Sequence, residues 1–124
     1  MSNVACILLL EDNLDLLNMT AEVLELAGHE VLRGRSGKDG LDILESGAMK
    51  PDLILTDLMM PEMDGDVFIA HLRQDRRWMH IPTVVVSGET TDRARALAHG
   101  ANDFLLKPYR HVELLNIARQ LVMG

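Results

Sequence analysis

Four short apolar runs in this chain each end at a polar side chain, and this pattern limits the folds that the chain can adopt. The runs, with the polar groups that follow them, are residues 4–10 before Glu11 and Asp12, 53–55 before Thr56 and Asp57, 84–86 before Ser87, and 104–106 before Lys107. Segments with helical spacing separate the runs, which predicts β-α-β units with right-handed crossovers and a parallel sheet. Ligands of open α/β sheets bind at the carboxyl ends of the strands. We therefore expect these polar groups to form one site.

Helix-start signals precede the segments between the runs. Helices are expected to begin at Asn13, at Ser36, at Asp64 and Gly65, at Thr90 or Thr91, and near Arg110. A short second strand is expected at Val31 and Leu32, and its polar neighbours place it at a sheet edge.

The apolar spacing of the later helices indicates which side chains they bury. In the third helix Val67, Phe68, His71 and Leu72 are spaced for one face, and in the fourth helix we expect Ala94, Leu97 and Ala98 to face inward. The last helix carries two adjacent apolar stripes, one of residues 114, 117 and 121 and one of residues 115, 118 and 122. This is more than one narrow buried face needs, which leaves one stripe for a partner.

These elements predict an α/β fold with a doubly wound, five-stranded parallel sheet and five helices. With the second strand at an edge and the four polar strand ends adjacent, the strand order 2-1-3-4-5 of flavodoxin-like folds is the most economical. It places the switch point of the sheet beside Asp12 and Asp57. A length of 124 residues suits one domain, residues 1–124, without an output domain after the last helix.

Composition excludes several classes of function. The formal net charge of -7 opposes direct binding to nucleic acid or to an anionic membrane, and no apolar run approaches the roughly 20 residues that span a bilayer. The single cysteine, Cys6, cannot form an internal disulfide, so a cytoplasmic, reducing location is expected. The basic residues 73, 76 and 77 are interpreted as a solvated turn, with Trp78 folded onto the core.

The predicted strand ends carry groups suited to a divalent metal and a phosphoryl group. Converging carboxylates repel one another unless a cation compensates their charge, and Glu11, Asp12 and Asp57 offer the oxygen ligands that Mg²⁺ prefers. Asp57 stands apart at its strand end and is a plausible nucleophile, which could form an acyl phosphate. Lys107 and the Ser87 hydroxyl could then hold the other phosphoryl oxygens.

These residues resemble the receiver domain of two-component response regulators, the CheY-like family, over essentially the whole chain. The resemblance rests on Glu11-Asp12, on the segment DLMMPEMDG at residues 57–65, on Ser87-Gly88 and on Lys107-Pro108. Departures are mild, because Glu11 stands where aspartate is more usual, Ser87 where threonine is commoner and Gly88 where alanine is frequent. None of them removes a required functional group.

The resemblance implies a role for each site residue. Asp57 is implied to accept a phosphoryl group from a phosphohistidine of a histidine kinase or phosphotransfer protein, in a reaction that needs Mg²⁺. The implied metal ligands are Asp12, Asp57 and the backbone carbonyl of Met59, with Glu11 acting through metal-bound water. Ser87 and Lys107 would contact the phosphoryl group, and the Lys107-Pro108 peptide bond would be cis.

The resemblance also implies a switch with an output surface. Phe104 would couple the site to the surface of the fourth helix, fifth strand and fifth helix, where an unknown downstream protein would bind. The resemblance is also compatible with a homodimer. Such a domain is no enzyme beyond its own phosphorylation and dephosphorylation. Met59 and Glu89 resemble positions that tune the lifetime of the phosphoryl group. A stand-alone regulator, a phosphorelay intermediate and a fragment of a longer protein fit this sequence equally.

Three other functions remain as alternatives. A phosphatase or dehalogenase would use Asp57 as nucleophile, but such phosphatases usually carry a second acid two residues later, where this chain has Met59. The sequence gives even less support for nucleotide binding, because no glycine-rich phosphate-binding motif follows the first strand. An interaction module that works without phosphorylation is less expected, since the acceptor, metal and lysine positions are intact.

Overall fold

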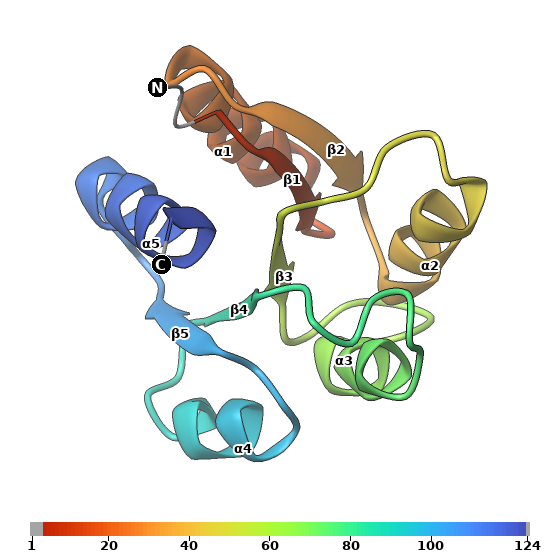
Figure 1. Ribbon diagram of the computed structural model, residues 1–124. Coiled ribbons are helices and arrows are strands. Elements are labelled where there is room, and N and C mark those ends of the chain that lie inside the picture. The colour runs from red at the N-terminus through yellow and green to blue at the C-terminus, as the bar shows by residue number, and fades with distance from the viewer. Residues whose placement is uncertain (1–3, 124) are drawn as a thin grey trace.

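The computed structural model describes residues 4–123, which form a five-stranded parallel sheet between two layers of helices (Figure 1). Along the chain the elements are β1 (Cys6–Leu10), α1 (Leu14–Leu26), β2 (Glu30–Gly34), α2 (Gly37–Ser46), β3 (Leu53–Asp57), α3 (Gly65–Arg73), β4 (Thr83–Ser87), α4 (Asp92–Ala98), β5 (Asp103–Leu106) and α5 (His111–Met123). The strand order is β2-β1-β3-β4-β5, and every neighbouring pair is parallel. The predicted fold class and strand order are confirmed.

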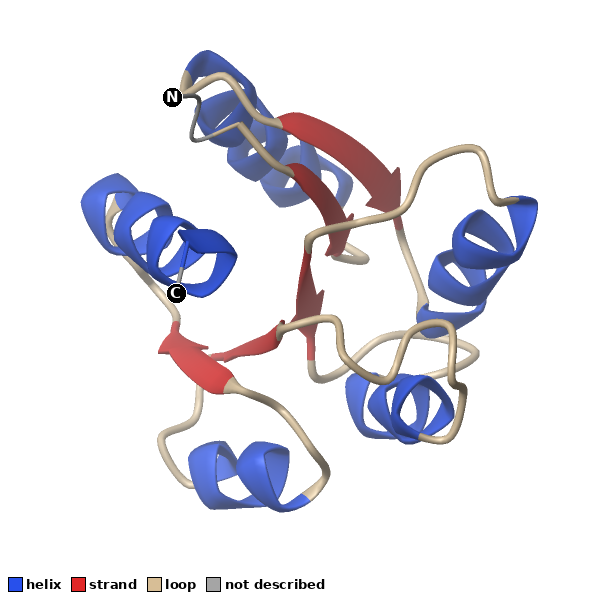
Figure 2. Cartoon of the chain, in the orientation of Figure 1, coloured by secondary structure: helices blue, strands red, loops and turns tan. Residues whose placement is uncertain are grey.

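The two faces of the sheet bury separate sets of apolar side chains. Helices α1 and α5 cover one face, and α2, α3 and α4 cover the other; Figure 2 shows the helices on both sides of the strands. Successive residues of β1 alternate between the two cores, with Ile7 and Leu9 on one side and Leu8 and Leu10 on the other. Both faces of the central strands therefore exclude water, which explains their uninterrupted apolar sequence.

Side-chain caps fix three of the helix starts where the sequence predicts them. Asn13, Ser36 and Asp64 accept hydrogen bonds from the backbone N–H groups three residues later, at 3.0, 3.1 and 3.3 Å. These bonds satisfy N–H groups that have no partner within the helix. The fourth helix differs, because Thr91 stands at its start without a side-chain capping bond.

The predicted inward faces of α3 and α4 are partly wrong. In α4 the buried residue is Ala96, whereas Ala94, Leu97 and Ala98 are exposed. The helix has seven residues and packs beside the edge strand β5, so only one narrow face of it contacts the core around Phe104. A similar rotation affects α3.

In α3 the buried face is rotated away from Val67 and His71. Phe68 and Leu72 are buried as predicted, together with Ile69, whereas Val67 and His71 are exposed. Ile69 packs in the core beneath α4, and Phe68 and Leu72 pack in the core beneath α2. The helix therefore bridges two apolar clusters, which requires adjacent buried positions rather than one stripe.

Both apolar stripes of α5 pack on the protein's own core. Leu114, Ile117 and Ala118 are buried, and the remaining members of the stripes, Leu115, Leu121 and Val122, pack partly buried against the same cluster. Helix α5 contacts both the sheet and the core that α1 shares, so it covers a wide face. A whole stripe left for a partner is therefore not observed.

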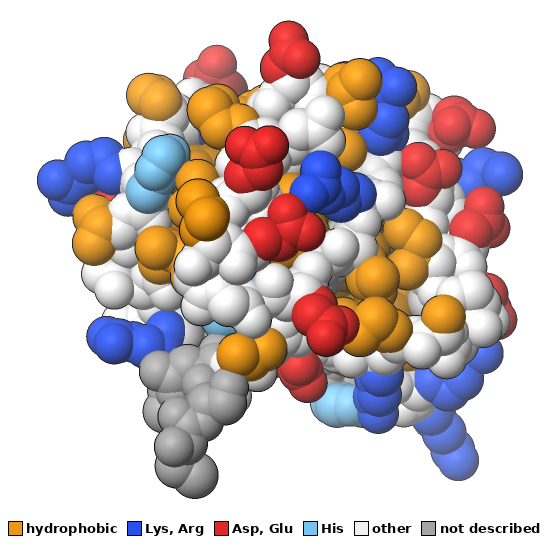
Figure 3. All heavy atoms as spheres, turned by 90° about the horizontal axis from the view of Figure 1, so that it is seen from above, with side chains coloured by type: hydrophobic (Ala, Val, Ile, Leu, Met, Phe, Trp, Pro, Cys, Tyr) orange, Lys and Arg blue, Asp and Glu red, His pale blue; other side chains and the backbone are white. Residues whose placement is uncertain are grey.

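The surface agrees with the interpretation of the basic residues as a solvated turn. Trp78 is buried, and the Arg77 guanidinium lies 4.1 Å above its ring while pairing with Glu45 and Asp75. Acidic and basic side chains are interspersed on the face that Figure 3 shows. None of the helices in residues 4–123 combines the length and apolar character needed to cross a bilayer.

Candidate functional site

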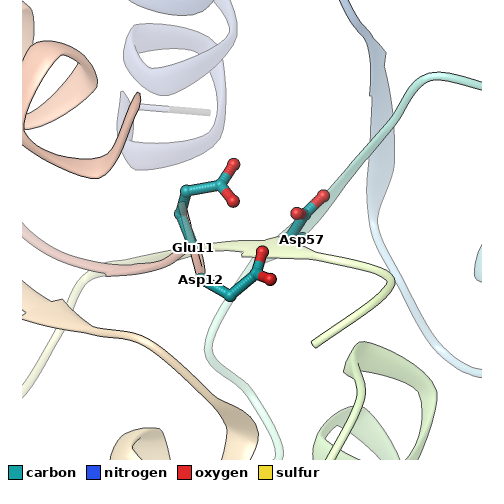
Figure 4. Close-up of side chains that lie close together, drawn as sticks. All are labelled: Glu11, Asp12 and Asp57. Carbon is teal, nitrogen blue, oxygen red and sulfur yellow. The ribbon is translucent and has the colours of Figure 1, made fainter. Parts of the chain in front are cut away.

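Three carboxylates lie together at the carboxyl end of the sheet. Glu11 and Asp12 follow β1 directly, and Asp57 is the last residue of the neighbouring strand β3. Figure 4 shows the three side chains projecting into one shared space, and one carboxylate oxygen from each lies within 4.8 Å of the others. Glu11 is buried, Asp57 is half-buried and Asp12 is exposed, so the group opens to solvent on one side.

The ammonium of Lys107 bridges two of these carboxylates. Its Nζ lies 2.8 Å from Oε1 of Glu11 and 3.1 Å from Oδ1 of Asp57. The backbone N–H of Lys107 donates to the Ser87 carbonyl at 2.8 Å, and the following bond to Pro108 is cis, as the resemblance implies. Residues from β1, β3 and the loop after β5 thus meet at the strand ends as predicted.

Burial and charge shift the pKa values of this group in different directions. Burial and the charge of Glu11 raise the pKa of Asp57 to about 6, against the opposing effect of Lys107. Burial also opposes the charged form of Glu11, but hydrogen bonds from Lys107 and from the Asn13 N–H hold its pKa below the ordinary value. The two carboxylates in turn raise the pKa of Lys107, despite the burial of the ammonium.

The family model of the response regulator receiver domain matches residues 7–119 of this chain. The chain belongs to this family. Its relatives include the DNA-binding dual master transcriptional regulator RpaA of Synechocystis sp., 32% identical over 94% of this chain, and the KDP operon transcriptional regulatory protein KdpE of Escherichia coli K12, 38% identical over 87%. The chain spans 48% and 47% of the lengths of these two relatives, about half of each.

Solved structures agree with this assignment. The signal receiver domain of a signal transduction histidine kinase from Syntrophus aciditrophicus superposes with a TM-score of 0.87 and 30% identity, covering 97% of this chain and 91% of that chain. The match accounts for almost the whole sheet and its helices. The protein is thus a receiver domain of a two-component system, and the assignment of residues 1–124 to a single domain stays a prediction.

The carboxylates of this receiver domain fit the requirements of a magnesium ion. Mg²⁺ takes oxygen ligands, retains several waters and is commonly bound through one or two carboxylates. Three carboxylate oxygens within 4.8 Å and one open side meet these requirements. Burial, and then the charge of Glu11, raise the pKa of Asp57, and Lys107 offsets this rise only in part. Met59, whose carbonyl is the third implied ligand, is an exposed residue of the loop after β3.

The Ser87 hydroxyl of the receiver domain has a partner that the sequence did not indicate. Ser87 is buried at the end of β4, and its Oγ donates a hydrogen bond to Oδ2 of Asp92, 2.6 Å away. The backbone N–H of Glu89 donates to the same Oγ at 3.2 Å. Asp92 is the first residue of α4. Its acidic side chain five residues after Ser87 was the only sequence signal for this contact.

Phe104 lies inside the molecule rather than on the output surface. It is 8% exposed and packs with Leu58, Ile69, Val85 and Ala96. This cluster joins the loop that follows Asp57 to helix α4. A role of Phe104 in coupling the two stays a prediction.

The raised pKa of Asp57 predicts that Asp57→Asn stabilises the domain without metal. Between the ordinary pKa of 3.8 and about 6 the folded protein holds a proton that the unfolded chain releases, so stability falls as pH rises through this window. With an allowance for partial exposure and for the lost contact with Lys107, the gain at pH 7.5 is about 1 kcal/mol, fading toward pH 4.

Urea unfolding in a chelator across this pH range measures the effect. Asp42→Asn is the control, because Asp42 is an exposed residue of α2 that forms a surface ion pair with Lys38, and we expect a change below about 0.5 kcal/mol. A variant Asp57→Asn that is less stable than wild type at every pH would contradict the prediction.

Proposed function

We propose that this receiver domain accepts a phosphoryl group on Asp57 from a phosphohistidine of a histidine kinase or phosphotransfer protein. The observation that supports it is the meeting of three carboxylates within 4.8 Å, with the Lys107 ammonium touching two of them. A carboxylate oxygen of Asp57 attacks phosphorus, and the bond between phosphorus and the histidine nitrogen breaks. Its electron pair stays on the imidazole, which takes up a proton, and an acyl phosphate forms on Asp57.

The other residues of the site would stabilise this transfer. Asp12, Asp57 and the Met59 carbonyl would hold Mg²⁺, with Glu11 acting through metal-bound water, and the ion would neutralise negative charge on the transferred group. Lys107 already contacts the acceptor, so its ammonium is placed to bind a phosphoryl oxygen once the Asp57 carboxylate has become an acyl phosphate. Ser87 would donate to another oxygen.

A groove beside Lys107 supports docking of a partner that carries the phosphohistidine. It has a volume of about 420 Å³ and lies between α1 and the start of α5. Its lining is mostly apolar and includes Leu16, Met19, Pro108 and Tyr109. An apolar groove that includes Lys107 in its lining suits a partner helix, which would bring the phosphoryl donor to Asp57.

The output would use the surface of α4, β5 and α5. Large apolar side chains are exposed on all three elements, namely Leu97 on α4, Leu106 on β5 and Val112 on α5. We propose that phosphorylation shifts an equilibrium between two arrangements of this surface and so controls a downstream protein or a second copy of the chain. The setting is the cytoplasm, and the domain turns over no substrate beyond its own phosphoryl group.

Intact mass spectrometry tests the proposal. Phosphoramidate is a donor with the same type of phosphorus–nitrogen bond as phosphohistidine. Incubation with phosphoramidate in the presence of Mg²⁺ is expected to add one phosphoryl group to the wild type and none to Asp57→Asn. Asp15→Asn, which removes an exposed acid near the start of α1, is the control and is expected to react as the wild type does. Equal uptake by Asp57→Asn would exclude Asp57 as the acceptor.

Two further measurements, phosphate release and the response of thermal stability to Mg²⁺, separate the proposal from its rivals. Continuous release of phosphate from an external phosphate ester would favour the phosphatase reading, in which the chain acts as an enzyme. A protein that takes up no phosphoryl group, and whose thermal stability does not respond to Mg²⁺, would favour an interaction module that works without phosphorylation.

A further inference from the structure

The contact between Ser87 and Asp92 commits the only proton of the serine hydroxyl. Ser87 Oγ donates it to Asp92 Oδ2 at 2.6 Å, and the oxygen accepts from the Glu89 N–H. A hydroxyl has one donor hydrogen, so donation to Asp92 excludes donation to a phosphoryl oxygen. The bond has a charged acceptor, and Ser87 is only 6% exposed, both of which strengthen it.

The same contact attaches helix α4 to the end of β4. The helix has seven residues, all described, and Ala96 is the one that is buried. Its charged links to the rest of the domain are few: Asp92 accepts from Ser87, and Nε of Arg95 lies 2.5 Å from Oδ2 of Asp66 on α3. Because Thr91 supplies no capping bond, Asp92 is the residue that ties the first turn of α4 to the sheet.

We propose that Asp92 is a positioning residue that competes with the phosphoryl group for the Ser87 hydroxyl. This inference rests on the proposed function of Asp57. A phosphoryl oxygen on Asp57 attracts the hydroxyl, and Ser87 can reach it only by leaving Asp92. The Asp92 carboxylate then loses its donor, and the first turn of α4 loses its link to β4. Asp92 thus opposes activation and passes the movement of Ser87 directly to the output surface.

A double-mutant cycle with Ser87 tests the competition. The probe is the beryllium trifluoride anion with Mg²⁺, a stable mimic of a phosphoryl group on a carboxylate, and its affinity is measured by calorimetry. Asp92→Ala is expected to tighten binding about tenfold or more, because a hydrogen bond with a charged acceptor no longer has to be broken. In a Ser87→Ala background the same substitution is expected to change nothing, because there is no hydroxyl to release.

The controls separate this effect from a general loss of negative charge. Asp15→Ala removes a carboxylate from the first turn of α1 and is expected to leave the affinity unchanged. Equal tightening by Asp92→Ala with and without Ser87 would overturn the proposal, as would no tightening at all. Asp92→Asn keeps the carbonyl acceptor, is expected to tighten binding less than Asp92→Ala, and carries the test if the alanine variant fails to fold.

Hydrogen exchange gives a second readout. The amides of residues 92–95 in the wild type are expected to exchange faster when beryllium trifluoride is bound. In Asp92→Ala they are expected to be fast already and to change little on binding, whereas unchanged protection in both proteins would contradict the link to α4. If the wild type binds no beryllium trifluoride, or Asp57→Ala binds it equally well, the proposed function fails and this inference fails with it.

Discussion

Replacing Gly65 by alanine is expected to destabilise the domain by about 2 to 3 kcal/mol and to weaken magnesium binding. A Cβ at Gly65 would lie 2.5 Å from the backbone oxygen of Asp57 and 3.1 Å from the Leu58 Cα. Both atoms belong to the backbone of the segment that carries the acceptor, so no flexible side chain can move aside. The Gly65 N–H also donates to the Leu58 carbonyl at 2.8 Å, and a shift of either residue strains this bond.

Gly88→Ala provides the matched control beside the same site. A Cβ at Gly88 meets no atom within 4 Å, so the substitution is expected to cost less than about 0.5 kcal/mol. Urea unfolding measures both stabilities, and a magnesium titration followed by calorimetry measures binding. If the two alanine variants unfold alike and bind magnesium alike, the close approach of Gly65 to Asp57 does not constrain the site.

The sequence predicts the sheet and the meeting of its polar ends because both follow from local patterns. Uninterrupted apolar runs require burial on both faces, and a parallel sheet brings the residues after those runs to one edge. Glu11, Asp57 and Lys107 lie far apart in the sequence, but each lies within two residues of the end of its own run. The strand order was therefore enough to predict that these residues meet. That order was itself predicted by placing the polar second strand at an edge and the strands with polar ends next to one another.

The features that the sequence does not predict depend on side-chain direction and on short distances. The prediction of the buried face of α4 was wrong. The sequence pattern of so short a helix does not fix its rotation about its own axis, and in the structure Ala96 is the residue that faces the core. The partner of Ser87 depends on the rotamer of Asp92. The need for glycine at residue 65 depends on a backbone approach that no spacing rule describes.

Replacing Lys107 by methionine is expected to destabilise the metal-free domain by about 2 kcal/mol at pH 8 and by much less at pH 5. The ammonium lies within 3.1 Å of two carboxylates, and its loss leaves Glu11 and Asp57 facing each other without compensation. Asp57, with a pKa already raised to about 6, would then hold its proton to a still higher pH. Because the folded variant prefers the protonated Asp57 carboxyl, the cost grows as pH rises through the Asp57 pKa. Below that pKa the smaller cost of the lost contact with Glu11 remains.

Magnesium should largely restore the stability of Lys107→Met at pH 8, because the ion supplies the positive charge that the variant lacks. Urea unfolding at both pH values, with Mg²⁺ and with a chelator, measures this effect. Lys50→Met removes the same charge from an exposed loop position and is expected to change stability by less than about 0.5 kcal/mol without a response to magnesium. If Lys107→Met were as stable as the wild type at pH 8 in chelator, the ammonium could not be what makes ionised Glu11 and Asp57 tolerable side by side. Rescue by Mg²⁺ would show that the metal compensates the same negative charge as the lysine, whose ammonium lies beside Glu11 and Asp57.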